Sequence, residues 1–173
     1  MGGKKGPDWT LLPASQRDIA QLRERCRKLV RRRAAFSAGV SALPVPGLDI
    51  VSDIRLFGLL IEDINREFGL TGEQIERLRP EFKLLAYEAA AGIGGMLIGK
   101  VVTRELVTRM LARGGVKQVA RQAGKLVPIA GQVMAAALSF VLFRQIGYQH
   151  VEACARVAQA LLVAGANQAP PPY

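Results

Sequence analysis

The 173-residue sequence is poor in the residues that most often carry disulfides, metals or catalysis. Its two cysteines, Cys26 and Cys154, lie far apart without a paired pattern, which excludes a disulfide framework and is typical of a reducing compartment. The single histidine, His150, has no second cluster of ligand residues elsewhere, and a metal site needs three or four ligands. We therefore predict no metal and no cofactor.

Acidic residues and aromatic residues are also scarce. There are 14 Asp and Glu against 24 Lys and Arg, a formal net charge of +10, and aromatics make up 6% of the chain. A basic excess of this size predicts an anionic partner, such as lipid headgroups, nucleic acid or an acidic protein face. No stretch alternates between apolar and polar residues with a period of two, so we predict an all-α protein. No apolar segment follows the basic N-terminus as in a secretory signal, and a cytoplasmic location is expected.

The chain is organised around residues 43–71, LPVPGLDIVSDIRLFGLLIEDINREFGLT. Pro44, Pro46 and Gly47 predict a turn, because proline lacks the amide hydrogen and pushes the preceding residue out of the α region. Asp49 and Asp53 then fall in the first turns of a helix, where carboxylates favour the positive end of the helix dipole.

This helix carries one continuous apolar stripe. Its members, spaced by three or four residues, are Ile50, Ile54, Phe57, Ile61, Ile64 and Phe68. Gly69 is predicted to lie just past the helix end, where glycine is the usual residue. Thr71 and Gln74 resemble a capping box that opens the next helix.

The same stretch resembles the C-terminal helical region of the immunity-related, interferon-inducible GTPases. It is also similar to bacterial membrane-linked helical domains that follow Era-like GTPase domains. The resemblance continues to KLVPIAG at 125–131, to Ser-Phe at 139–140 and to HVEACARVAQALL at 150–162, and it spans roughly residues 33–165. It implies a helical domain that is buried in itself and attaches to membranes. The GTPase domain has no counterpart here, so nothing about nucleotide hydrolysis is carried over.

The rest of the pattern predicts six or seven helices in a single compact domain over residues 15–165. Ser15 with Asp18 opens the first helix, Pro80 ends a short one, and Gly165 stops the last. Flexible tails are expected at residues 1–14 and at the proline-rich residues 166–173. The predicted helices cover residues 15–33, with a helical continuation over 34–43, and then 49–68, 72–79, 81–110, 126–143 and 149–164.

Two rows of small residues recur every fourth position. The first row is Ala91, Gly95 and Gly99, and the second is Gly131, Ala135 and Ser139. Small residues at this spacing let two helix backbones approach closely, so we predict that these two segments pack tightly against each other.

Basic residues are concentrated in two places, and both predict contact with an anionic surface. The first predicted helix ends in RKLVRRR, at residues 27–33. The second place is a band with a period of four, formed by Arg109, Arg113, Lys117, Arg121 and Lys125. A membrane surface would reward such a band at about 1 kcal/mol per basic residue. Nucleic acid is the second candidate, although no aromatics are interleaved with the charges.

Three constellations that suggest catalysis do not meet its requirements. Gly94 to Lys100 matches part of a phosphate-binding loop, but Val101 replaces the magnesium-binding Ser or Thr and no strand precedes it. Cys154 lies one helical turn from His150 with no third group to orient the histidine, so this face is predicted to be core. Glu62 and Asp63 are adjacent and lie on different faces, which makes a poor acid–base pair. No catalytic residues are predicted.

The sequence thus predicts a non-catalytic helical module at the cytoplasmic face of a membrane. Its expected partners are an anionic membrane surface and a protein, with a separately encoded GTPase as one candidate. A basic nucleic-acid-binding protein is one alternative. An integral helical hairpin is another, because residues 126–143 would form a helix of about 27 Å against a hydrocarbon core of about 30 Å.

Overall fold

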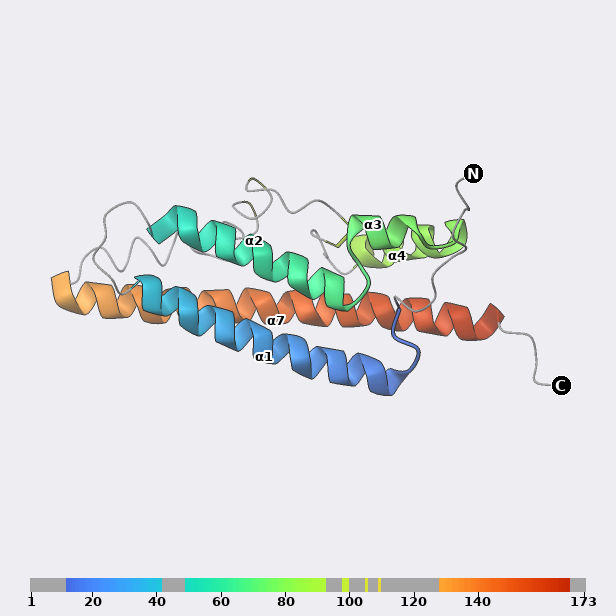
Figure 1. The fold of residues 1–173 in the computed structure, drawn as a ribbon, viewed down its shortest axis with the longest axis horizontal. Coiled ribbons are helices and arrows are strands. Elements are labelled where there is room, and N and C mark those ends of the chain that lie inside the picture. Colours follow the sequence, from blue (N-terminus) through green and yellow to red (C-terminus); the bar gives the residue numbers. More distant parts are fainter. Residues whose placement is uncertain are drawn as a thin grey trace, which may run out of the picture. The chain divides into compact units, whose positions relative to one another are not determined.

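The computed structural model describes residues 12–41, 49–92, 98, 99, 105, 109 and 128–168, and these ranges are almost entirely helical (Figure 1). The all-α class is therefore confirmed for the described residues, whereas the count of six or seven helices stays a prediction. The helices are α1 (Gln16–Ser41), α2 (Asp49–Glu67), α3 (Gly72–Glu76), α4 (Pro80–Gly92) and α7 (Pro128–Gln168).

The chain divides into two compact units, each assembled from segments that are distant in sequence. Unit 1 takes its residues from Met1–Cys26, Asp63–Val101 and His150–Tyr173, and unit 2 from Arg27–Glu62 and Val102–Gln149. The domain boundaries predicted at residues 15 and 165 stay predictions.

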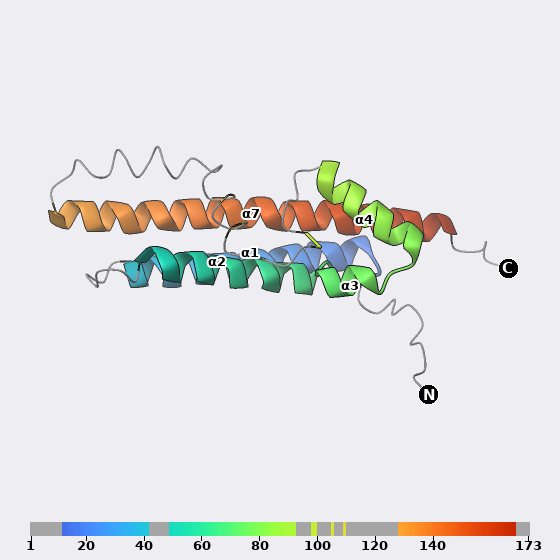
Figure 2. The same ribbon diagram turned by 90° about the horizontal axis from the view of Figure 1, so that it is seen from above.

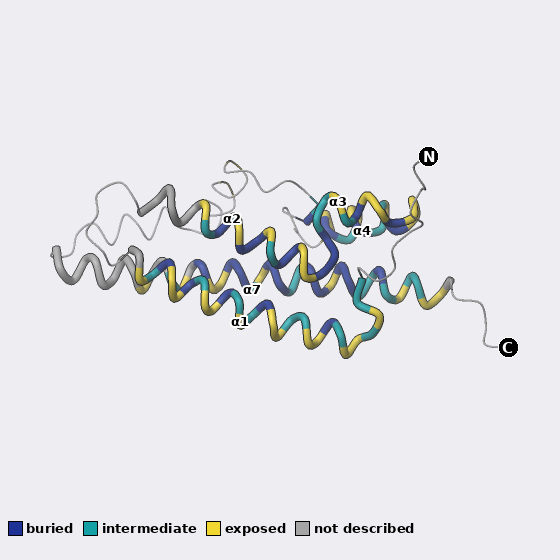
Figure 3. Tube along the Cα trace, viewed as in Figure 1, coloured by how far each residue is buried: buried dark blue, intermediate teal, exposed yellow. Residues whose placement is uncertain are grey.

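The start of α1 confirms the expected helix opening. Ser15 Oγ accepts a hydrogen bond from the Asp18 amide at 3.1 Å, which satisfies one of the amides that a helix start leaves unpaired. Ile19 and Cys26 follow on the buried side, with Val30 and Ala34 further along the helix. Figure 3 shows the resulting alternation of buried and exposed positions along α1.

The end of α2 agrees with the expected glycine stop. Gly69 has φ of +72°, a left-handed conformation that glycine adopts without strain. Its amide donates to Arg66 O at 3.2 Å, and the Leu70 amide donates to Asn65 O at 2.8 Å. These two bonds form a Schellman motif, and Leu70 is fully buried beyond it.

The capping box at Thr71 is confirmed. The Gln74 amide donates to Thr71 Oγ1 at 3.2 Å, and the Thr71 amide donates to Gln74 Oε1 at 3.1 Å. The short helix α3 that follows lies beside α4 (Figure 1 and Figure 2). Pro80 is the first residue of α4, the helical position that best tolerates a missing amide hydrogen.

The helix predicted over residues 81–110 is wrong, because α4 ends at Gly92 and Ile98 and Gly99 form a turn. Gly99 has φ of +69°, and its amide donates to Leu70 O at 3.0 Å. A Cβ at Gly99 would lie 2.8 Å from Tyr87 Cε1 and 2.9 Å from Ile75 Cδ1, so this position requires glycine for both its conformation and its space.

The row Ala91, Gly95 and Gly99 therefore does not lie along one helix. Ala91 is exposed on α4, Gly99 lies in the turn, and Gly95 lies outside the described residues. Several glycines close together weaken a helix by roughly 1 kcal/mol each relative to alanine, which favours the break. The second row, Gly131, Ala135 and Ser139, is helical within α7, but its side chains lie outside the described part.

The two separate helices predicted at 126–143 and 149–164 are in fact the single helix α7. Gly147 lies inside it, buried, where a Cβ would come within 2.7 Å of Val30 Cγ1. The glycine is therefore explained by the close approach of α7 to α1 within unit 2, not by a helix break. Gly165 does not stop the helix, which continues to Gln168.

The described core of unit 2 contains an aromatic pair. The rings of Phe57 and Phe143 meet edge to face, with centroids 4.9 Å apart and an interplanar angle of 88°. Leu60, Ile61 and Ile146 are buried in the same unit. Burial of each such side chain contributes about 1.5–3 kcal/mol. Phe57 and Ile61 are the described members of the α2 stripe that are buried in this unit.

The predicted turn at Pro44, Pro46 and Gly47 lies outside the described residues. Asp49 and Asp53 are in the first turns of α2, as expected, but their side chains are not described. Their capping role stays a prediction.

Candidate functional site

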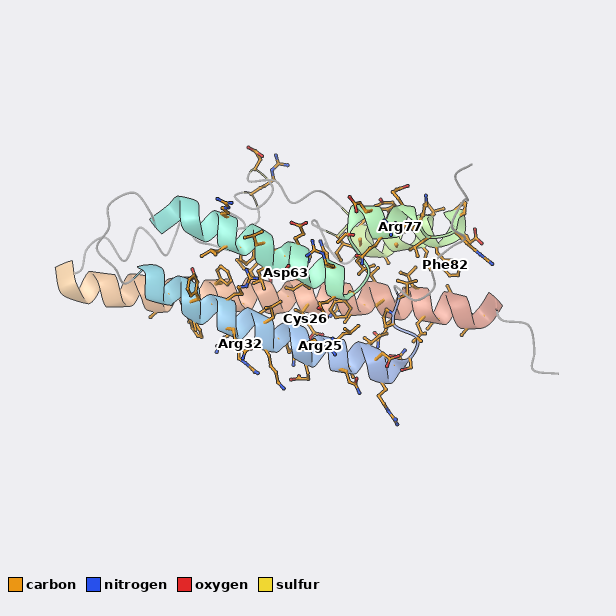
Figure 4. The ribbon with its side chains drawn as sticks, in the orientation of Figure 1. Arg25, Cys26, Arg32, Asp63, Arg77 and Phe82 are labelled. Carbon is orange, nitrogen blue, oxygen red and sulfur yellow. The ribbon has the colours of Figure 1, made fainter. Side chains whose placement is uncertain are left out.

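The exposed side of α1 in unit 2 presents a cluster of cations. Lys28, Arg31 and Arg32 are all exposed and fall on one side of the helix, with Arg32 marked in Figure 4. Their orientation is fixed from the opposite side, where Val30 and Ala34 are fully buried. We call Lys28, Arg31 and Arg32 the basic face.

Along its own helix the basic face has one acidic residue within a turn, Glu24, which lies four residues before Lys28. From Arg25 to Ser41, both included, the sequence contains six basic residues and no acidic one. Among the described residues, no carboxylate forms an ion pair with Lys28, Arg31 or Arg32. The positive charge on this side of α1 is therefore not neutralised within the described part of the chain.

The cations of unit 1 differ, because several of them are paired. Arg23 meets Glu152 at 3.1 Å, and Arg25 meets Glu67 at 3.3 Å. Lys83 meets Glu76 at 2.9 Å, and Glu76 also accepts a hydrogen bond from Tyr87 Oη at 3.2 Å. These bonds lower the pKa of the Glu76 carboxyl, with the Lys83 bond as the largest cause. Such exposed pairs contribute little to stability. Because these cations are already paired with carboxylates, they attract an anionic ligand less strongly than unpaired cations do.

Of the second basic band, the structure describes the first residue, Arg109. Arg109 is helical and exposed, whereas Arg113, Lys117, Arg121 and Lys125 lie outside the described residues. The band predicted at 109–125 stays a prediction, and the basic face of α1 is the part of the basic pattern that the structure places.

A buried polar cluster lies in unit 1, and only two of its members, His150 and Cys154, were predicted from the sequence. His150 Nε2 lies 2.9 Å from Asn65 Oδ1, and Cys154 Sγ donates to the same oxygen at 3.5 Å. Cys154 Sγ is also 3.6 Å from His150 Nε2. Because Asn65 Oδ1 can only accept, His150 carries its hydrogen on Nε2. Asn65 and His150 are 1% and 3% exposed, and Cys154 is fully buried.

The cluster is built to stay uncharged. Burial lowers the pKa of His150 to about 4 and raises the pKa of the Cys154 thiol well above its usual value. Burial is also the largest cause that raises the pKa of the nearby Cys26 thiol to about 12. A nucleophilic cysteine requires a lowered thiol pKa, so this arrangement has the properties of a satisfied core cluster and not those of a thiolate site.

Asn65 could have been found from the sequence by its position. It is a polar residue directly after Ile64 in the apolar stripe of α2, and a polar residue at such a place requires a buried partner. The partner lies 85 residues away, and no local pattern indicates which residue it is.

Two further features are absent from the described ranges. No three or more His, Cys, Asp or Glu side chains come together there in an arrangement that could hold a metal ion. No helix in these ranges has both the length and the apolar character that crossing a bilayer requires.

Comparison with known proteins gives partial similarity to one kind of GTPase. The chain is 27% identical over 124 residues to interferon-inducible GTPase 5 of Bos taurus, and 29% identical over 124 residues to the protein of that name from Rattus norvegicus. Each alignment covers 70% of this chain but only 26% and 27% of those proteins, so the chain spans about a quarter of their length. No protein-family model matches the chain. No solved structure matches it.

Proposed function

We propose that the chain is a non-catalytic helical module that attaches to an anionic membrane surface and to a protein partner. The basic face of α1 is the observation that supports the membrane half most strongly. Its three cations are exposed, lie on one side of one helix and have no carboxylate partner among the described residues. Each would gain about 1 kcal/mol near anionic headgroups at moderate salt. The cytoplasmic leaflet carries such headgroups and is the surface we propose.

Replacing two of these cations should weaken membrane binding. For the variant Arg31→Gln with Arg32→Gln, we expect sedimentation with phosphatidylserine-containing liposomes to need about 30-fold more lipid, from about 1 kcal/mol per charge. The matched control is Arg77→Gln with Arg156→Gln, which removes two exposed cations from unit 1. Binding of the wild type should also fall with salt, since the Debye length shrinks from about 8 Å at 0.15 M to 3 Å at 1 M.

The alternative partner, nucleic acid, is tested in the same liposome assay. Duplex DNA is added to liposome-bound protein, and the protein that leaves the lipid is measured. Quantitative release, together with a steep salt slope for DNA binding, would overturn the membrane proposal. Equal loss of binding in both double variants would show that net charge acts, and not the basic face.

The partner half of the proposal rests on the partial similarity to interferon-inducible GTPase 5 and on the motif at residues 43–71. We propose a separately encoded GTPase as the protein partner. On this view the GTPase supplies the nucleotide site, and this chain supplies membrane attachment.

The chain alone is accordingly expected not to bind GTP. Val101 stands where a phosphate-binding loop has its magnesium-binding Ser or Thr, and Gly99 is held by Leu70 O in a turn. Isothermal titration calorimetry with GTP and magnesium should give no heat of binding. Micromolar binding that Lys100→Ala abolishes would contradict both the prediction and this division of roles.

A further inference from the structure

Phe36 lies on the same side of α1 as the basic face and is left uncovered. It is 60% exposed, a large fraction for an aromatic side chain, and follows Arg32 by one helical turn. Ser37, the next residue, is fully buried, so the rotation of the helix at this point is fixed. Ala35 and Gly39 are the other exposed residues of this turn, and both are small.

We infer that Phe36 is a membrane-inserting residue that enters the boundary between headgroups and acyl chains while Lys28, Arg31 and Arg32 contact anionic headgroups. This inference rests on the proposed membrane attachment and specifies how it occurs. Cations beside an exposed aromatic side chain are the usual pattern of a helix that lies in the membrane interface. Because Ala35 and Gly39 are small, they allow the helix backbone to approach the headgroups closely and leave Phe36 as the side chain that projects furthest into the apolar region.

Two other large exposed apolar residues of the described chain, Leu84 and Leu59, have acidic neighbours instead. Leu84 on α4 is equally exposed, at 60%, but Glu81 and Glu88 lie one turn away on each side. Leu59 on α2 has Glu62 one turn away. An anionic surface would repel these neighbours, whereas it attracts the neighbours of Phe36. The positive charge beside Phe36 therefore favours a lipid surface with negative headgroups as the binding partner of this part of α1.

The test places a fluorescent reporter at the proposed inserting position. Trp9 is the only tryptophan of the chain, so Trp9→Phe with Phe36→Trp leaves a single tryptophan at position 36. With phosphatidylserine–phosphatidylcholine vesicles, we expect its emission to move to shorter wavelength and to be quenched by lipids brominated on the acyl chain. The matched control, Trp9→Phe with Leu84→Trp, should show neither change.

A second measurement uses no reporter. Phe36→Ala should weaken partitioning onto the same vesicles about tenfold, because an inserted aromatic side chain loses its transfer from water. Leu84→Ala should leave partitioning unchanged, and both variants should melt like the wild type because both positions are exposed.

The outcomes separate the inference from the proposed function. If wild type and Phe36→Ala bind equally and the tryptophan at 36 stays in water, insertion is wrong while electrostatic attachment stands. If the wild type does not sediment with anionic vesicles at all, both are overturned. If the wild type binds neutral vesicles as strongly as anionic ones, the role assigned to the neighbouring cations is wrong.

Discussion

Acidification from about pH 7.5 to about pH 4 is expected to lower the free energy of unfolding by about 3 kcal/mol through His150 alone. The folded protein holds the pKa of His150 at about 4 because the side chain is buried, against 6.5 for an exposed histidine. Between these values the unfolded chain binds the proton and the folded chain does not. Stability from this residue is therefore complete above pH 6.5 and is lost progressively as the pH falls towards 4.

The measurement compares urea unfolding of the wild type and of His150→Gln across this range. Glutamine can still donate to Asn65 Oδ1 from its amide but does not titrate, so it keeps the polar contact and removes the pH dependence. We expect the two stability curves to converge as the pH falls. Parallel curves would show that His150 is protonated equally easily in both states and that the buried cluster is misassigned.

The second large effect is expected at Gly147. Gly147→Leu should destabilise the protein by about 3 kcal/mol, because its Cβ would lie 2.7 Å from Val30 Cγ1 and 3.0 Å from Val30 Cγ2. Valine is branched at Cβ and stiff, so it cannot move aside as the end of a long side chain would. Thermal and urea denaturation followed by circular dichroism would measure the loss.

Gly165 provides the matched control for this substitution. It lies in the same helix, α7, and a Cβ there would meet nothing within 4 Å. Gly165→Leu should leave stability unchanged or raise it by up to about 1 kcal/mol, the gain in helix propensity. A similar loss at both positions would mean that packing against Val30 is not the cause.

Features that depend on neighbours along the chain were predictable from the sequence. The Ser15 cap, the Thr71–Gln74 capping box and the glycine after α2 each arise from hydrogen bonds over three to five residues. Their residue types and spacings are therefore visible as patterns. The helical class follows from the same local information.

Features that depend on distant partners could not be predicted. Gly99 leaves the helical pattern because Leu70 O accepts its amide, and Gly147 stays within a helix because Val30 leaves no room for a side chain. From the sequence alone, each glycine was interpreted by its place in its own helix. The physical cause is in both cases a contact with a residue that is distant in sequence, Leu70 for Gly99 and Val30 for Gly147. The partnership of Asn65 with His150 is of the same kind.

The cations of the candidate site could be predicted from the sequence, whereas the exposure of Phe36 beside them could not. The run of cations in α1 is evident in the sequence, and the structure adds which of them are exposed on one side. Phe36 belongs to an apolar stretch that predicts burial, and only the rotation of α1, fixed by Val30, Ala34 and Ser37, leaves it in solvent. That rotation is a property of packing and not of local sequence.

The composite construction of unit 1 has a consequence for protein synthesis. Ile19 and Cys26 come near the beginning of the chain, whereas Val151, Val157 and Leu161 of the same unit come near its end. A ribosome needs on the order of 10 s to make the intervening residues. During that time α1 has left the ribosome, but the part of α7 that belongs to the core of unit 1 has not yet been synthesised. Nascent chains should therefore recruit chaperones that bind exposed apolar helices, and stalling translation before residue 150 should prolong that association.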